Sequence, residues 1–278
     1  MIQRLSAIAS NFDHFIIDIF GVIHDGIRPF PDTVHTLRTL KAEGKQICLL
    51  SNSPRLNNRV VQHMEDIGIP RSLYDHIVTS GEATHADLSR PQWHGKACWF
   101  IGKSFINDLS NLNLRFVDGP DIADFILNSI PGTGATEVEI LTRQLKTAVA
   151  KNLPMICANP DLVVNIGTEQ HECAGTFAAL YEQLGGPVTY HGKPHAPVYE
   201  TCHALLGHPD KSRIAAIGDS LHTDIAGANR FGVKGIWNLE GIHWEELTQN
   251  RAPSPEKIEA LIARQPHKPD FIIKGFSW

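Results

Sequence analysis

The sequence predicts an α/β protein with a parallel sheet and a second, smaller α/β domain inserted into the first. Short apolar segments alternate with helical segments, which is the pattern of right-handed crossovers in a parallel sheet. After residue 80 a separate set of alternations begins, and it continues to Gly185-Gly186-Pro187, a strong boundary signal. We therefore expect a discontinuous core of residues 1–80 and 187–278, with an inserted domain of residues 81–186.

The composition is that of an ordinary globular protein. The 278 residues are 42% hydrophobic and 20% charged, without the bias of a disordered chain. A formal net charge of −5 argues against a general nucleic-acid binder. The N-terminal residues lack an apolar signal core, no apolar run approaches a membrane-spanning length, and the five cysteines lack CxxC spacing. We expect a cytoplasmic protein with reduced thiols that binds neither membranes nor nucleic acids.

The first part of the core is expected to hold three strands and two helices. Pro31-Asp32 and Gly44 are start and stop signals for the first helix, and Gly68 ends the second. The expected strands are Phe15–Ile19, Gln46–Leu50 and Ile77–Thr79, and the expected helices are Thr33–Glu43 and Leu56–Ile67.

The insert and the second part of the core continue this alternation. In the insert we expect strands at Ala97–Ile101, Phe125–Asn128 and Met155–Ala158 and helices at Glu137–Asn152 and Gly175–Leu184. In the second part of the core we expect helices at Ala196–Leu206, Leu221–Phe231 and Pro255–Arg264, strands at Arg213–Ile217 and Val233–Trp237, and an edge strand at Phe271–Ile273.

Polar side chains gather in the loops that follow the expected strands. Because the carboxyl ends of parallel strands meet at one edge of a sheet, residues about 200 positions apart can lie together in the same crevice. The residues concerned are Asp18, Ser51, Asn52, Lys193 in His191-Gly192-Lys193-Pro194, and the pair Asp219 and Asp224.

The chemistry of this set favours a cation and a phosphate. Three carboxylates at close range repel one another unless a cation compensates them, and Mg²⁺ is a hard, oxygen-liganded ion that suits them. Lys193 would supply a second positive charge, and Ser51, placed before a helix, could bind a phosphate oxygen. A structural interpretation stays open for each residue. Asp219 suits an N-cap and Asp224 a first-turn acid of the following helix, Lys193 suits a solvated loop, and Ser51 or Asn52 suits a helix cap.

Four ordered motifs resemble those of the haloacid dehalogenase-like (HAD) superfamily over essentially the whole chain. The long insertion is similar to the type-II α/β cap of the NagD / nitrophenylphosphatase branch, so the resemblance implies a Rossmann-like core with an inserted cap. The cap segments that resemble this branch are Ala123-Asp124-Phe125-Ile126-Leu127 and Ala158-Asn159-Pro160-Asp161. The four motifs correspond to Asp18-Ile-Phe-Gly-Val, Leu50-Ser51-Asn52-Ser53, Gly192-Lys193-Pro194 and Gly218-Asp219 to Asp224.

The resemblance implies a Mg²⁺-dependent phosphohydrolase that acts on a small phosphorylated metabolite. Asp18 would be the nucleophile that forms an aspartyl-phosphate, and covalent catalysis of this kind divides a difficult displacement into two steps. Ser51, Asn52 and Lys193 would bind the phosphoryl group. The implied metal ligands are the Asp18 carboxylate, the backbone carbonyl of Phe20 and Asp219, with Asp224 in support, and Asn159, Pro160 and Asp161 of the cap are the candidates for substrate contact.

Phe20 departs from the family pattern. Most phosphatases of the superfamily have a second aspartate at this position, which acts as a general acid and base, and its loss typically costs about 10²–10⁴ in rate. The chain would then be a slow or specialised phosphohydrolase that favours a good leaving group or takes a proton from His24, Asp25 or the substrate. The alternatives are a non-catalytic protein that binds a phosphorylated ligand and a dehalogenase-like hydrolase. A homodimer through the cap is also open.

Overall fold

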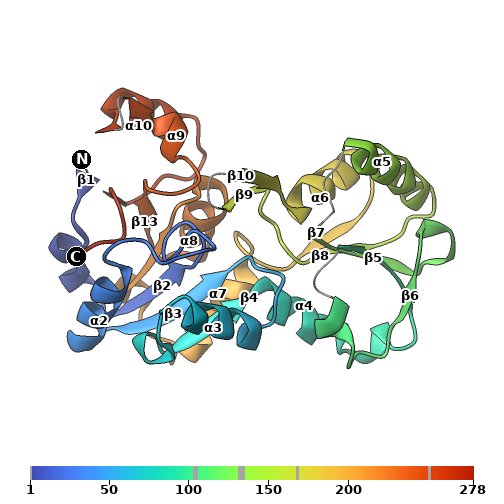
Figure 1. The fold of residues 1–278 in the computed structure, drawn as a ribbon, viewed down its shortest axis with the longest axis horizontal. Helices are drawn as coiled ribbons and strands as arrows, with labels where there is room; N and C mark the ends of the chain where they lie inside the picture. Colours follow the sequence, from blue (N-terminus) through green and yellow to red (C-terminus); the bar gives the residue numbers. More distant parts are fainter. Residues whose placement is uncertain (1, 103–105, 131–134, 167–168, 250–251) are drawn as a thin grey trace.

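The computed structural model describes residues 2–102, 106–130, 135–166, 169–249 and 252–278, and Figure 1 shows their two large sheets in separate lobes. All neighbouring strands of the seven-stranded sheet are parallel, as predicted. In sheet order the strands are β1 (Ile2–Gln3), β16 (Phe271–Ile273), β13 (Lys234–Asn238), β12 (Ile214–Gly218), β2 (His14–Asp18), β3 (Gln46–Ser51) and β4 (His76–Thr79).

Helices cover both faces of this sheet because its strands are apolar on both sides. In β2, Phe15 and Ile17 pack in one core cluster, and Ile16 packs in another on the opposite face. The first cluster lies under α1 (Leu5–Ile8), α2 (Thr33–Ala42) and α3 (Asn57–Asp66), and the second under α7 (Ala196–Leu205) and α8 (Ala226–Phe231). Helices α9 (Trp244–Leu247) and α10 (Pro255–Ala263) close the end near β13 through a third cluster.

The five-stranded sheet forms the second lobe and is also parallel throughout. Its order is β11 (Val188–Tyr190), β8 (Met155–Cys157), β7 (Phe125–Ile130), β5 (Ala97–Gly102) and β6 (Arg115–Val117). Helices α5 (Ala135–Ala150) and α6 (Ala174–Gln183) cover one face, and the end of α4 (Ser80–Leu88) packs on the other. The fold class predicted from the sequence is thus confirmed.

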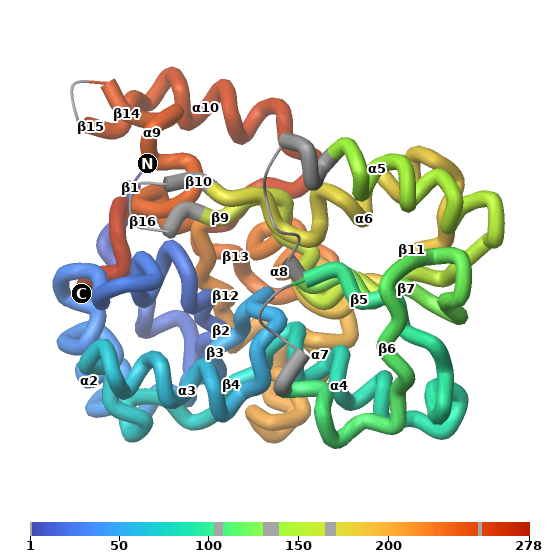
Figure 2. Tube along the Cα trace, turned by 45° about the vertical axis from the view of Figure 1, so that its right-hand side comes forward, coloured from blue at the N-terminus to red at the C-terminus, as the bar shows by residue number. Residues whose placement is uncertain are grey.

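An antiparallel hairpin extends from this lobe toward the seven-stranded sheet (Figures 1 and 2). It consists of β9 (Val163–Ile166) and β10 (Glu169–Glu172), which follow β8 and precede α6. The sequence analysis did not predict this hairpin, because its strands are short and its segment mixes polar and apolar residues without a clear period.

Three expectations need correction. Phe271–Ile273 is not an edge strand, because the two-residue strand β1 pairs with it from outside. The segment expected as one helix from Leu221 begins as a π-helix at Leu221–Ile225 and continues as α8. Ser51 does not lie directly before a helix, since it ends β3 and α3 begins only at Asn57.

One strand of the five-stranded sheet lies outside the residue range expected for the insert. Strand β11 lies beyond residue 186, yet it pairs with β8 in the five-stranded sheet. We therefore propose that the chain returns to the core domain after β11, in the loop that carries Lys193, and that residues 1–80 and the remainder form the core.

Two further expectations concern the state of the cysteines and the presence of membrane-spanning helices. All five cysteines are buried and free, as expected for reduced thiols. Within the described ranges, every helix falls short of the length and apolarity needed to cross a bilayer.

Candidate active site

The polar strand ends meet at the point in the sheet where the order of the strands reverses. From β2 the chain adds β3 and β4 on one side, whereas β12, β13 and β16 lie on the other side, so the carboxyl ends of β2 and β12 flank a topological switch point. Asp18 is the last residue of β2, and Asp219 directly follows β12. The register of the two strands therefore brings together residues that are far apart in the sequence.

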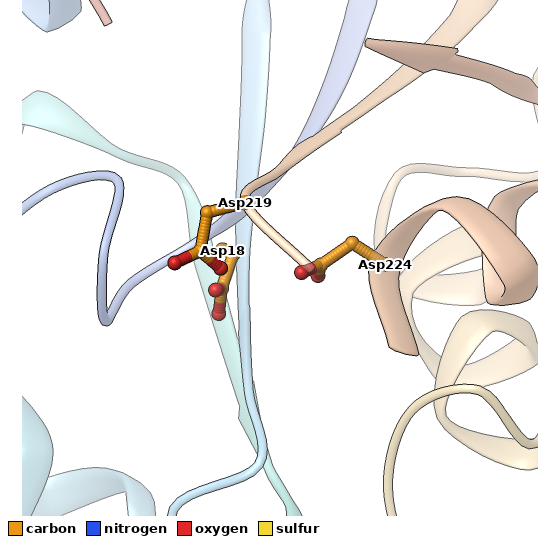
Figure 3. Close-up of side chains that lie close together, drawn as sticks. All are labelled: Asp18, Asp219 and Asp224. Atoms are coloured by element: carbon orange, nitrogen blue, oxygen red, sulfur yellow. The ribbon is translucent and has the colours of Figure 1, made fainter. Parts of the chain in front are cut away.

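Asp18, Asp219 and Asp224 form one acidic cluster (Figure 3). One carboxylate oxygen from each lies within 4.8 Å of the others, and all three side chains are at least nine-tenths buried. The π-helical turn carries the Asp224 side chain back toward the strand ends, where the Ser220 amide donates to Asp224 Oδ2 at 3.1 Å. Their carboxylate oxygens are close enough together for one cation to contact all three.

Lys193 lies within this cluster and is 3% exposed. Its Nζ donates to Asp18 Oδ1 at 2.6 Å and to Asp224 Oδ1 at 2.8 Å. Burial disfavours the charged ammonium, but the carboxylates of Asp18 and Asp224 outweigh burial and hold the pKa of Lys193 well above its ordinary value. Lys193 is therefore a fixed cation at the floor of the site.

One ammonium does not balance three buried carboxylates. Burial raises the pKa of Asp18 well above its ordinary value, with Lys193 opposing this effect and Asp224 adding to it. Burial and the neighbouring charge of Asp224 raise the pKa of Asp219 to about 7. The site as built from the chain alone thus disfavours ionisation of its own acids, which is the electrostatic condition that a bound divalent cation relieves.

Two glycines allow the backbone to close around Asp219. A Cβ on Gly21 would lie 2.0 Å from Asp219 Oδ2, and one on Gly241 would lie 2.3 Å from the same atom. The amide of Ile242 donates to Asp219 Oδ2 at 2.8 Å, and Trp237 Nε1 donates to the Asp219 carbonyl at 2.8 Å. These contacts fix the orientation of the Asp219 carboxylate.

Asn52 joins the core motifs to one another and to the insert. Its Oδ1 accepts from the Lys193 amide at 2.7 Å, and its Nδ2 donates to the Lys193 carbonyl at 3.1 Å. The same Nδ2 donates to Asp161 Oδ1 at 2.8 Å. Asn52 thereby positions the backbone of Lys193, while Ser51 Oγ accepts from the Ser53 amide at 3.1 Å at the end of β3.

The Asn159-Pro160-Asp161 loop follows β8 and lies against the site. Asn159 Oδ1 accepts from the Asp161 amide at 3.1 Å, so the segment also forms the turn that its composition favours. Asn159 and Asp161 line the cavity above the acidic cluster, whereas Pro160 is not among the described residues that line it. The Pro160 carbonyl instead lies against Gly175, where a Cβ would come within 2.2 Å of its oxygen.

A cavity of about 900 Å³ opens above the acidic cluster, between the core and the insert. Its floor includes Asp18, Ser51, Asn52, Asp219 and Asp224. Its walls include side chains that the sequence analysis did not select, because neither motif nor period marks them: Phe30, Val60, His63, Leu162, Val163, Val164, His171, Ile242 and Trp244.

Phe20 and His24 form one side of this cavity. Their rings meet edge to face at 5.2 Å, and the His24 ring meets that of His63 in the same way at 5.4 Å. The amide of Gly26 donates to His24 Nδ1 at 2.9 Å. Burial, with a smaller effect of His63, lowers the pKa of His24 to about 4, so its ring is neutral at pH 7.

The fold and the site define an α/β protein with a buried acidic site at a topological switch point of its sheet and a second α/β lobe above it. A family model described as "Haloacid dehalogenase-like hydrolase" matches residues 15–115, and a second HAD-like hydrolase model matches residues 190–277. A solved hydrolase of the haloacid dehalogenase-like family from Brucella suis is 30% identical, with a TM-score of 0.83 and 99% coverage of both chains. The chain belongs to the haloacid dehalogenase-like family.

Curated relatives confirm the branch within this family that the sequence resembles. The 4-nitrophenylphosphatase of Schizosaccharomyces pombe is 25% identical, and the match covers 96% of this chain and 92% of the relative. The D-glycerol 3-phosphate phosphatase of Mycobacterium tuberculosis is also 25% identical, with coverage of 91% of this chain and 71% of the relative.

We expect Gly21→Ala to impair binding of a divalent cation. The new Cβ would displace Asp219 from the cluster, and the positive φ of 84° adds a strain of roughly 1–2 kcal/mol. Gly232→Ala is the matched control, since Gly232 also has a φ of 84° but nothing lies within 4 Å of its added Cβ. The measurement is the rise in the thermal unfolding midpoint on adding Mg²⁺, which a ligand of the native state produces.

Wild-type protein and Gly232→Ala should both show this rise, and Gly21→Ala should show little or none. A full response in Gly21→Ala would contradict the assignment of Asp219 to the cation site.

Proposed function

We propose that this protein is a Mg²⁺-dependent phosphohydrolase that acts on a small phosphorylated metabolite through an aspartyl-phosphate on Asp18. The observation that carries the proposal is the Asp18 carboxylate, buried at the floor of the cavity with Lys193 Nζ 2.6 Å away and two further acids beside it. The relatives named as phosphatases support phosphoryl transfer over dehalogenation for this chain.

The residues present fit a magnesium ion. The donor set offers hard carboxylate oxygens, which Mg²⁺ prefers, and the cluster has more negative charge than Lys193 can compensate. Asp18, Asp219 and the backbone carbonyl of Phe20 would hold the ion, with Asp224 in support. When bound, Mg²⁺ would neutralise charge on the phosphoryl oxygens and help to align them.

The chain's own residues divide the reaction into two steps. In the first, an Asp18 carboxylate oxygen forms a bond to phosphorus as the bond between phosphorus and the ester oxygen breaks, and the leaving oxygen takes a proton from solvent water, from His24 or Asp25, or from the substrate itself. In the second, water attacks the same phosphorus atom as the bond between phosphorus and the Asp18 oxygen breaks. Inorganic phosphate leaves, the proton of the attacking water passes to the phosphate or to solvent, and the Asp18 carboxylate is restored. Lys193 holds Asp18 in place and carries a positive charge beside the phosphoryl group, while Ser51 and Asn52 would contact its oxygens.

The insert contributes to the walls of the cavity and is hydrogen-bonded to a residue of its floor. The hydrogen bond from Asn52 to Asp161 connects the loop after β3 with the loop after β8. Asn159 and Asp161 are our candidates for substrate contact in this loop, and Pro160 would act by shaping the turn. The cytoplasmic location and a homodimer through the cap stay predictions.

Phe20 makes the protein a slow or specialised member of its class under this proposal. A phenyl ring cannot donate a proton to the leaving oxygen, so substrates with an acidic leaving group should react best. The neutral His24 ring packs against Phe20 but also accepts a hydrogen bond from Gly26, and this contact fixes its Nδ1. A protein that binds phosphorylated ligands without turnover is the alternative that the Phe20 side chain favours.

We predict Mg²⁺-dependent phosphate release from 4-nitrophenyl phosphate that is lost in Asp18→Asn. The amide is a poor nucleophile, and it also removes one anionic metal ligand, so activity should fall to the buffer background. Asp32→Asn is the control, because Asp32 is exposed and makes no side-chain cap bond at the start of α2. Release that persists in Asp18→Asn at the wild-type rate would exclude Asp18 as the nucleophile.

We predict that Phe20→Asp raises the rate for a phosphate ester of a poorly acidic alcohol by about 10²–10⁴, the usual contribution of a general acid and base. Phe20→Leu is the control, because it shortens the side chain and supplies no proton donor. The measurement is kcat with glycerol phosphate. Should kcat stay unchanged in Phe20→Asp, then residue 20 does not limit turnover and the proposed reason for slow catalysis is wrong.

A further inference from the structure

We propose that the cavity selects a phosphate ester whose leaving group is aromatic or similarly apolar and carries no anionic group. This inference deepens the proposed function and rests on it, since it takes the acidic cluster and Lys193 as the place of the phosphoryl group. The remainder of the substrate then lies between the ring array of the core and the hairpin strand β9 of the insert.

The core side of the cavity is an aromatic wall. Phe20, His24 and His63 form a continuous edge-to-face array with ring centroids 5.2 and 5.4 Å apart, and all three residues line the cavity. Aromatic rings pair favourably in this geometry, and a further ring adds area burial to that interaction. Phe20 therefore cannot act as a proton donor, but its ring can pack against the apolar part of a substrate whose phosphoryl group lies at the acidic cluster.

The opposite side is aliphatic. Leu162, Val163 and Val164 all line the cavity from the insert, and Leu162 is 51% exposed. Binding becomes more favourable when an apolar ligand covers a large exposed apolar side chain at the wall of a cavity. The cavity volume of about 900 Å³ accommodates a group of at least the size of an aryl ring beside the phosphoryl group.

The charges around the cavity do not favour a second anion on the substrate. Asp25 pairs with Arg28 at 3.6 Å, and Glu240 pairs with Lys274 at 3.4 Å. Two further acids that line the cavity, Glu172 and Glu245, have no ion pair among the described residues. In the described part of the chain, Arg55 is the one arginine or lysine that lines the cavity.

Arg55 is the residue that could favour the opposite preference, a substrate with a second anionic group. Its side chain is exposed and could bind a carboxylate or a second phosphate at the cavity rim. Two unpaired glutamates against one arginine leave the rim negative, however, and such a field disfavours an anionic group at short range.

The experiment compares kcat/KM within two matched pairs of esters in the presence of Mg²⁺. Phenethyl phosphate and ethyl phosphate share a primary alkoxide leaving group, and the phenyl group should raise kcat/KM by about tenfold or more through apolar burial. The esters para-ethylphenyl phosphate and para-(carboxyethyl)phenyl phosphate share a para-alkylphenol leaving group. The carboxylate should lower kcat/KM several-fold at low ionic strength, and added salt should reduce this difference.

Two variants locate the effects in the cavity, each with a matched control outside it. Leu162→Ser should reduce the preference for phenethyl phosphate, whereas Leu205→Ser, at a leucine that is 42% exposed on α7, should not. Glu172→Lys should raise kcat/KM for the carboxylate ester relative to the neutral one, and Glu200→Lys, exposed on α7, should leave the ratio unchanged.

The outcomes separate this inference from the proposed function. Equal kcat/KM for phenethyl and ethyl phosphate overturns the inference while phosphohydrolase activity stands. Preference for the carboxylate ester that disappears in Arg55→Ala also overturns it, because the cavity then selects anions. If no ester is hydrolysed, the proposed function fails, and binding of phenethylphosphonate against ethylphosphonate decides the inference: tighter binding of the phenethyl compound supports it, and equal binding overturns it.

Discussion

The buried contact of Lys193 with Asp18 and Asp224 is the interaction on which the rest of the site depends. Burying three carboxylates within 4.8 Å of one another costs free energy that the core packing alone would have to offset. The Lys193 ammonium, 3% exposed and bonded to two of the acids, removes part of this cost. The remaining negative charge favours binding of a further cation. A site that holds such a cation beside Lys193 is suited to binding an anionic phosphoryl group.

The fold supplies the supports for this contact from distant parts of the chain. Parallel pairing of β2 with β12 sets Asp18 beside Asp219, and the π-helical turn after β12 brings Asp224 to the ammonium. Asn52 holds the backbone of Lys193 on both its amide and its carbonyl and reaches Asp161 in the insert. The position of the Lys193 ammonium thus depends on the contact between the two lobes, so a movement of the insert would be transmitted to the acidic cluster.

The sequence predicted the parts of the molecule that local pattern encodes. Apolar runs ending in a polar residue located β2, β3 and β12, and their shared sheet edge predicted the cluster of Asp18, Asp219 and Asp224 with Lys193. Strands β1, β6, β9, β10 and β11 were missed because two to four residues carry too little periodicity, and they acquire their structure from pairing. The cavity walls could not be predicted either, since His63 and Leu162 meet the site only through the packing of the two lobes.

Detection of a phosphoryl group on Asp18 during turnover tests the central claim most directly. Because Phe20 cannot activate water, hydrolysis of the aspartyl-phosphate should be slow enough for the intermediate to accumulate. The protein would be mixed with Mg²⁺ and 4-nitrophenyl phosphate, quenched with acid and digested, and the peptide that contains Asp18 analysed by mass spectrometry. We predict a phosphoryl group on Asp18 that is absent without Mg²⁺. Phosphate release with Asp18 unmodified, or with the phosphoryl group on another residue such as His24, would contradict the account.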